Sequence, residues 1–198
     1  MLNCGQSCIA AKRFILIEGI YDEFVAKFTK AVRDLKSGNP LAEDTKIGVM
    51  TLKDLADQLQ TQVKESVNQG AELLFEGDQK DCYHEPTILG NVKPGMPAFD
   101  EETFGPLAAM IKAKGIQHAF ELSENSKYGL GVTVCTNNIE KALKYAYKVS
   151  DGAYFVNELV KSDPRLPFGG TKKSGYGREL AKDGMIEFVN RKTVYIKK

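Results

Sequence analysis

The sequence predicts an α/β fold, in which a mostly parallel sheet is covered by helices on both faces. Short apolar runs alternate along the chain with stretches whose apolar residues recur at helical spacing, the pattern of β-α-β units. The chain has 198 residues, 42% of them apolar, which is enough for one domain with a sizeable core. No internal repeat or low-complexity segment interrupts this alternation.

The first half of the chain supplies two helices and two strands. In order, we expect a strand at 14–17, a helix at 22–35 ended by Gly38 and Pro40, a helix at 51–69 ended by Gly70, and a strand at 73–75. Thr51 followed three residues later by Asp54 resembles a capping box, which predicts the start of the second helix.

The second half continues the alternation, with two irregular stretches. The expected elements are a strand at 107–111, a helix around 116–120, a strand at 132–134, a helix at 139–146 and a strand at 153–156. Residues 77–104, rich in Pro, Gly and Asp, and the glycine-dense residues 167–177 are expected to be loops. Irregular backbone on a rigid scaffold is where binding and catalytic residues concentrate.

The C-terminal tail is expected to form a helix at 179–189 and a strand at 193–196. A terminal strand leaves backbone donors and acceptors open, so it pairs with a partner or with the edge of its own sheet. The sequence leaves both alternatives open.

Composition excludes several classes of function. Lys and Arg number 27 against 26 Asp and Glu, a net charge of +1, so nothing indicates binding to nucleic acid or an anionic membrane. No apolar run approaches the roughly 20 residues of a bilayer helix, and no signal peptide is evident, so we expect a cytoplasmic protein. The four cysteines form no disulfide framework, and His84 and His118 lie far apart, so no metal site is predicted.

Cys8 is the first candidate for chemistry. It ends the run Asn3-Cys4-Gly5-Gln6-Ser7-Cys8, whose glycine allows the backbone to approach closely. A cysteine is a nucleophile where its surroundings favour the thiolate, and otherwise it is a small buried apolar residue. Both interpretations are open at this point.

Two further stretches are candidates for a binding site: the acidic residues 100–102 and the glycine-dense residues 167–177. The three carboxylates at 100–102 are either a solvated surface or hold one acid rigidly for a sugar hydroxyl, because Phe104-Gly105-Pro106 fixes the backbone that follows. The glycine-dense segment is not a Walker A phosphate loop, because Lys173-Ser174 precede Gly175 instead of following it. A tightly routed loop remains.

Together these motifs resemble the C-terminal part of the NAD(P)-dependent aldehyde dehydrogenase superfamily. They are Asn3-x-Gly5-Gln6-x-Cys8, Glu102-x-Phe104-Gly105-Pro106 and Pro167-Phe168-Gly169-Gly170-x-Lys172-x-Ser174-Gly175-x-Gly177-Arg178-Glu179. The resemblance covers essentially the whole chain, although Gly48-Val49 departs from the usual Gly-Pro. Ala-Ala-Lys-Arg at 10–13 and Ser-Asp-x-Arg at 162–165 are similar to bacterial succinate-semialdehyde dehydrogenases.

The resemblance implies a role for residues in the first two motifs. Cys8 would attack the aldehyde carbon to give a thiohemiacetal and then a thioester, whereas Cys4 has no assigned role. Glu102 would hold the nicotinamide ribose of NAD or NADP, with Phe104 packed beside it.

The resemblance also implies a substrate pocket and a domain division. Phe168 would line the aldehyde pocket, and Ser162 or Arg165 would bind the distal carboxylate of succinate semialdehyde. Residues 1–177 would form the catalytic domain. Residues 178–198 would supply a helix and a strand that joins a neighbouring subunit in a homo-oligomer.

The resemblance implies that the family's dinucleotide-binding domain, which distinguishes NAD from NADP, has no counterpart in this sequence, so both cofactors stay open. We therefore expect either part of an aldehyde-oxidising enzyme or a catalytically inactive fragment that acts only as a folded or assembly domain.

Overall fold

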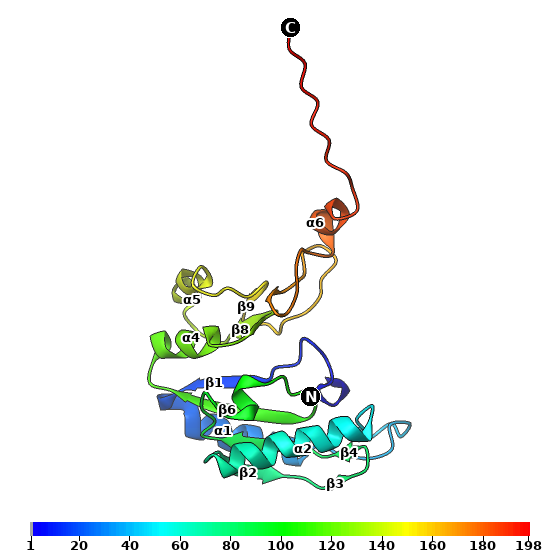
Figure 1. Ribbon diagram of the computed structural model, residues 1–198. Coiled ribbons are helices and arrows are strands. Elements are labelled where there is room, and N and C mark those ends of the chain that lie inside the picture. Colours follow the sequence, from blue (N-terminus) through cyan, green and yellow to red (C-terminus); the bar gives the residue numbers. More distant parts are fainter. Residues whose placement is uncertain (1) are drawn as a thin grey trace. The chain divides into compact units, whose positions relative to one another are not determined.

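A computed structural model describes residues 2–198 (Figure 1). The chain divides into two compact units. Unit 1 ends at Ser126, and unit 2 comprises Lys127–Lys198.

Unit 1 is built on a four-stranded sheet in the order β1-β6-β5-β2. Its strands are β1 (Arg13–Ile17), β2 (Glu72–Glu76), β5 (Thr87–Gly90) and β6 (Leu107–Ala113). β6 pairs in parallel with both β1 and β5, and β2 runs antiparallel at the edge. The predicted mostly parallel sheet is therefore confirmed.

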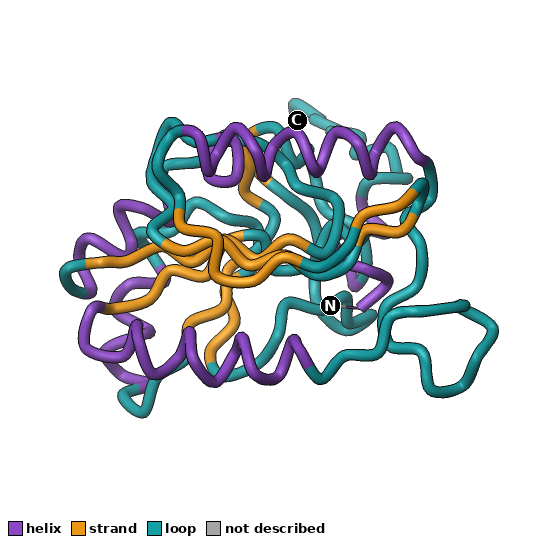
Figure 2. Tube along the Cα trace, turned by 90° about the horizontal axis from the view of Figure 1, so that it is seen from below, coloured by secondary structure: helices purple, strands orange, loops and turns teal. Residues whose placement is uncertain are grey.

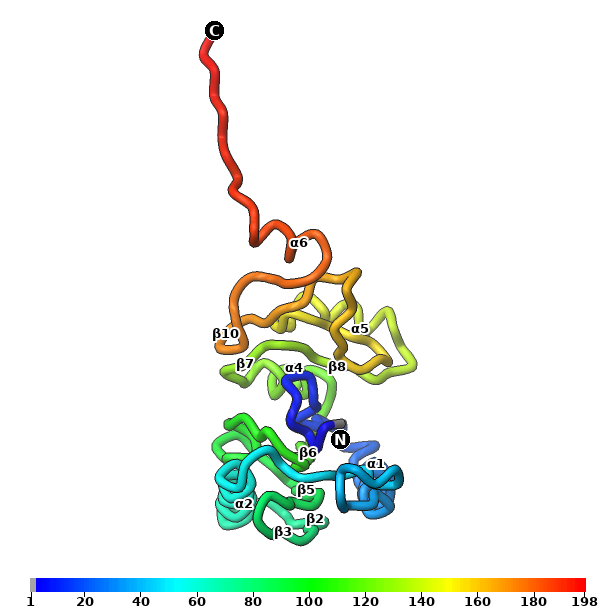
Figure 3. The backbone as a smooth tube through the Cα atoms, turned by 90° about the vertical axis from the view of Figure 1, so that its right-hand side faces the viewer, coloured from blue at the N-terminus to red at the C-terminus, as the bar shows by residue number. Residues whose placement is uncertain are grey.

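Alternate residues of the strands face opposite helices. On one face Leu16 and Met110 pack with α1 (Glu18–Arg33), and on the other Ile111 packs with α2 (Lys53–Asn68). α4 (Ile116–Glu124) supplies Leu122 to the α2 side. Figure 2 shows strands between two layers of helix, and Figure 3 shows α1 and α2 on opposite sides of β5 and β6. Because strand side chains alternate, apolar runs such as 107–111 must be covered on both faces.

Two predictions for unit 1 were wrong. Residues 77–104 are not a single loop: they contain β3 (Gln79–Lys80), β4 (Tyr83–His84), the buried β5 and the short helix α3 (Pro97–Asp100). The capping box at Thr51 is also absent, because α2 begins at Lys53 with no side-chain cap and Thr51 binds Gln6 instead.

Unit 2 is made of short elements. They are β7 (Tyr128–Gly129), β8 (Val132–Val134), α5 (Ile139–Ala146), β9 (Tyr154–Val156), β10 (Thr171–Lys172) and α6 (Ala181–Ile186). β8 and β9 pair in parallel, and β7 and β10 pair antiparallel. The Asn138 side chain caps α5 by accepting a 2.8 Å hydrogen bond from the Lys141 amide.

The tail beyond α6 is extended chain without assigned strand (Figure 1). Val194, Tyr195 and Ile196 are 74–83% exposed, and within residues 2–198 no strand pairs with them. In this structure the tail therefore does not pair with the edge of the chain's own sheet. No helix in the part of the chain that is described is both long and apolar enough to cross a bilayer.

Candidate active site

The segment that leads to Cys8 has an unusual backbone. The 3-10 helix η1 (Leu2–Gly5) contains Asn3 and Cys4 at φ 49° and 54°, and Gly5 follows at φ 74°. Left-handed backbone is rare for residues other than glycine and costs energy, so its surroundings must hold it in place. A Cβ added to Gly5 would lie 2.2 Å from the Gly105 carbonyl oxygen, so glycine is required for this close approach.

Gln6 fastens the same segment to the start of α2. Its side-chain oxygen accepts hydrogen bonds from the Thr51 amide and hydroxyl at 2.8 and 2.9 Å. Its side-chain amide donates to the Val49 carbonyl at 3.4 Å. The glutamine is thus a structural brace for the cysteine-bearing loop.

The two cysteines of this loop differ in accessibility. Cys4 is 6% exposed, and its burial raises the pKa of its thiol, so it stays protonated and out of reach. Cys8 is exposed. Of the two, only Cys8 is open to a substrate.

Lys12 reaches back to this loop from the start of β1. Its Nζ donates a 2.8 Å hydrogen bond to the Gly5 carbonyl and lies 4.4 Å from the centre of the Phe104 ring. Burial lowers the pKa of Lys12 to about 8, although the charges of Glu102 and Cys8 oppose this shift. The structure therefore brings Cys8, Glu102 and Phe104 together around Lys12, a residue that sequence analysis used only as part of a family motif.

The acidic run at 100–102 is divided among three roles. Asp100 accepts a 3.0 Å hydrogen bond from the Gly95 amide, and Glu101 accepts one of 2.8 Å from the buried Gln62 side chain. Glu102 is exposed and sits beside the buried Thr103. Asp100 is thus bound within its own segment and Glu101 is bound to α2, whereas Glu102 faces solvent and Lys12.

Unit 2 holds the other three predicted site residues on one segment. Ser162 is exposed, and Phe168 is half-buried. The backbones of Phe168 and Glu179 exchange two hydrogen bonds, with N–O distances of 2.8 and 2.7 Å. Arg165 forms a two-pronged pair with Asp163, at 2.9 Å from Nε to Oδ1 and 2.7 Å from Nη2 to Oδ2. The guanidinium holds the pKa of the Asp163 carboxyl well below its usual range. The predicted carboxylate anchor is therefore already occupied by an internal carboxylate.

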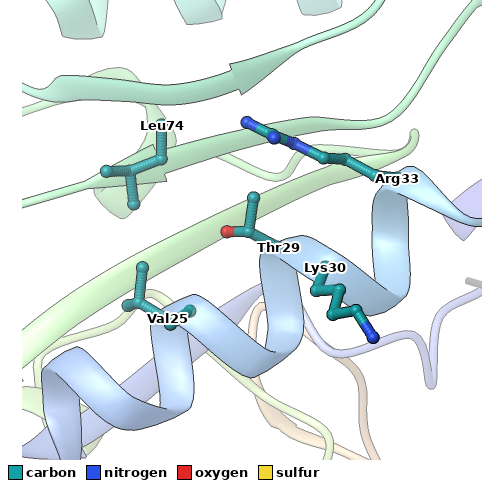
Figure 4. A pocket seen from close by; sticks show the side chains of 6 residues that line it. Val25, Thr29, Lys30, Arg33 and Leu74 are labelled. Carbon is teal, nitrogen blue, oxygen red and sulfur yellow. The ribbon is translucent and has the colours of Figure 1, made fainter.

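A shallow hollow of about 270 Å³ lies elsewhere in unit 1, between α1 and β2 (Figure 4). It is lined by Val25, Ala26, Thr29, Lys30, Arg33 and Leu74. None of the predicted site residues lines it. It offers cations and apolar walls but no cysteine, so we do not assign the chemistry to it.

Comparison with known proteins identifies the family. Residues 1–194 match the aldehyde dehydrogenase family. The chain is 45% identical to the succinate semialdehyde dehydrogenase of Escherichia coli, named as NAD(P)+-dependent, over 98% of this chain and 42% of that protein. A probable NADP+ succinate-semialdehyde dehydrogenase of Synechocystis is 42% identical over 99% of this chain and 44% of its own length.

Solved structures agree with these relatives. The succinic semialdehyde dehydrogenase of Streptococcus pyogenes, crystallised with NADP+, is 36% identical with a TM-score of 0.93, covering 99% of this chain and 44% of that one. The sequence thus spans less than half the length of the relatives it matches. Since the family match extends over residues 1–194 and the fold agrees with a solved member, the chain belongs to the aldehyde dehydrogenase family.

Proposed function

We propose that this chain carries the nucleophile of an NAD(P)-dependent aldehyde dehydrogenase and that Cys8 is that nucleophile. The observation that supports this proposal best is the contrast between exposed Cys8 and buried Cys4 on one braced loop. Exposure beside the cationic Lys12 is the setting in which a cysteine becomes reactive.

In the proposed reaction, the Cys8 thiolate adds to the aldehyde carbon and the carbonyl oxygen becomes an oxyanion. The Cys8 backbone amide is a donor for that oxyanion. The resulting thiohemiacetal loses its hydride and becomes a thioester, which water cleaves to release the carboxylic acid and restore the thiolate. The nicotinamide cofactor, when bound, supplies the acceptor for this hydride.

Glu102 and Phe104 fit a role in holding the nicotinamide ribose. Glu102 is an exposed carboxylate on a segment fixed by the Gln62 side chain, which binds Glu101 and the Glu102 carbonyl. Such a carboxylate can accept hydrogen bonds from two ribose hydroxyls. NAD and NADP are both compatible with this contact, because it involves no 2′-phosphate.

The nucleophile is tested with iodoacetamide and with an activity assay. We expect Cys8 to be alkylated faster than the exposed Cys135, which is the matched control for accessibility. If incubation with NAD or NADP and succinate semialdehyde yields reduced cofactor, Cys8→Ser should abolish it and Cys4→Ser should retain most of it. Equal alkylation of Cys8 and Cys135 would contradict the assignment.

We propose succinate semialdehyde as the substrate, with Arg165 as the anchor for its distal carboxylate and Ser162 beside it. The names of the relatives support this substrate, and the Arg165–Asp163 fork shows that this guanidinium binds a carboxylate with two prongs. Substrate would have to compete with Asp163. Phe168 would line the pocket with its half-buried ring.

In the full-length enzyme, Arg165→Ala should raise KM for succinate semialdehyde about tenfold or more, and far less for an uncharged aldehyde of equal length. Asp163→Asn is the matched variant. It removes the internal competitor and should leave KM for succinate semialdehyde unchanged or lower. Equal effects of Arg165→Ala on both aldehydes would overturn the anchor.

The second candidate function, an inactive folded or assembly domain, is favoured by one observation. The apolar side chains of Val194, Tyr195 and Ile196 are exposed on an extended tail, an arrangement suited to pairing with a neighbouring subunit. Light scattering of the same purified sample separates the candidates. No turnover, an unreactive Cys8 and an oligomer would favour assembly, and a monomer would count against it.

A further inference from the structure

Lys12 occupies an environment that lysines usually avoid. A lysine normally keeps its ammonium in water while its methylene stem covers apolar surface. Here the ammonium turns back to the Gly5 carbonyl and the Phe104 ring, and burial makes its charged form less favourable. An arrangement that disfavours the charge needs partners that offset this cost.

Those partners come from two segments far apart in the sequence. The Gly5 carbonyl belongs to the loop that carries Cys8, and Phe104 belongs to the 102–105 segment, at the end of the acidic run. The two segments are also in backbone contact, because Gly5 and Gly105 approach too closely for any side chain between them. The Lys12 ammonium therefore spans a junction between the predicted nucleophile and the predicted cofactor-binding residues.

Two anionic groups act on this ammonium. Glu102 and the Cys8 thiolate both favour protonated Lys12. The hydrogen bond to the Gly5 carbonyl holds this positive charge against the loop that carries Cys8, and a cation beside a cysteine is one of the settings in which cysteines are reactive. The next residue along the chain does not share this role, because the Arg13 guanidinium donates to the carbonyls of Leu122, Ser123 and Asn125 at the end of α4.

We propose that Lys12 is a positioning residue for the nucleophile: its ammonium fastens the Cys8 loop to the 102–105 segment and holds a positive charge beside that loop. This inference rests on the proposed function of Cys8. It adds a residue that acts on Cys8 without itself taking part in bond formation.

The experiment measures the alkylation rate of Cys8 by iodoacetamide near neutral pH, resolved by mass spectrometry of the peptide, in the full 198-residue chain. Lys12→Met removes both charge and hydrogen bond, Lys12→Gln keeps a donor without charge, and Lys12→Arg keeps both. We expect at least about threefold slower alkylation for the Met and Gln variants and a rate within about twofold of the parent for Arg.

Two controls separate charge from folding. Lys112→Met removes a lysine whose Nζ lies 4.4 Å from the Tyr21 ring, the same separation as in the Lys12–Phe104 pair, and should leave the Cys8 rate unchanged. Cys82, which is half-buried in unit 1, reports local unfolding, because faster labelling of Cys82 would reveal a loosened structure.

Each outcome decides the proposal. Slower Cys8 labelling in the Met and Gln variants, with Arg restoring it and Cys82 unchanged, supports it. Unchanged Cys8 labelling in both uncharged variants overturns it, as does faster labelling. If Cys82 labelling rises in Lys12→Met, that variant is set aside and the comparison of Lys12→Gln with Lys12→Arg decides the proposal. Equal reactivity of Cys8 and Cys135 in the parent chain instead overturns the proposed function, so the two failures are distinguishable.

Discussion

The two units of this chain keep their shapes by different means. Unit 1 contains both clusters of buried apolar side chains, one on each face of its sheet. Between Lys127 and Lys198 the buried positions are Ala142 and the glycines at 129, 170 and 184. Unit 1 is therefore stabilised largely by apolar burial, and unit 2 depends more on backbone routing and polar contacts.

The glycine loops show the same contrast at close range. In unit 2 a Cβ on Gly152 would lie 1.7 Å from the Gly169 carbonyl oxygen, and Arg178 Nη1 donates to the Gly170 carbonyl at 3.1 Å. In unit 1 the comparable approach of Gly5 to Gly105 rests on packed side chains, because a Cβ on Gly105 would lie 2.4 Å from Leu59. The loop that carries Cys8 thus has a packed core beneath it in addition to its hydrogen bonds from Gln6, whereas the glycine-dense loop depends on hydrogen bonds and close backbone approach.

The largest effect that distinguishes the units is expected from a pair of leucines. Leu59, on α2, is 2% exposed, and Leu143, on α5, is 53% exposed. Leu59→Ala should lower the unfolding free energy of unit 1 by about 2–5 kcal/mol, because it removes buried contacts and leaves a cavity. Leu143→Ala should lower that of unit 2 by no more than about 0.5 kcal/mol.

Hydrogen exchange measured separately for the amides of 2–126 and 127–198 checks this comparison. A single global unfolding curve would not measure the two units separately, because a chain with two units need not unfold in one step. Equal losses of protection for the two variants would break the distinction between a unit with a core and a unit without one.

The fold could be predicted from sequence where local pattern and tertiary structure agree. β6 was expected because its apolar run is long, and α1 and α2 because their apolar residues follow helical spacing. β5 was missed. It is four residues long and directly follows Pro86, and its place in the sheet depends on pairing with β6 and β2, which no local pattern contains.

The site was partly predictable for a similar reason. The sequence motifs contain Cys8, Glu102 and Phe104, so these residues could be identified as candidates. Their catalytic and cofactor roles stay predictions. Lys12 could not be singled out from sequence, because only the fold brings its ammonium over the Phe104 ring. Asp163 offered a usable signal, since it stands two residues before Arg165 and can fold back onto it.

A smaller effect than the loss expected for Leu59→Ala is a pH dependence confined to unit 1. The pKa of Lys12 is about 8 in the folded chain and 10.5 ordinarily, so between these values the unfolded chain binds more protons. The unfolding free energy contributed by Lys12 therefore rises with pH across this window, and below it the folded chain bears the full cost of the buried charge. After allowance for solvent screening, the rise should be about 1 kcal/mol.

The difference in unfolding free energy between the parent and Lys12→Met isolates this contribution from the other groups of unit 1. Cys4 and Tyr21 also titrate at alkaline pH, and because burial raises the pKa of each, they oppose the rise. Both remain in the variant, so their contributions cancel. The unfolding free energy of the parent should rise relative to that of the variant as pH increases from about 7 to about 10. Hydrogen exchange of the unit 1 amides measures this change. A difference that stays constant, or a gain of the same size in unit 2, would show that the Lys12 ammonium is not held in a buried site.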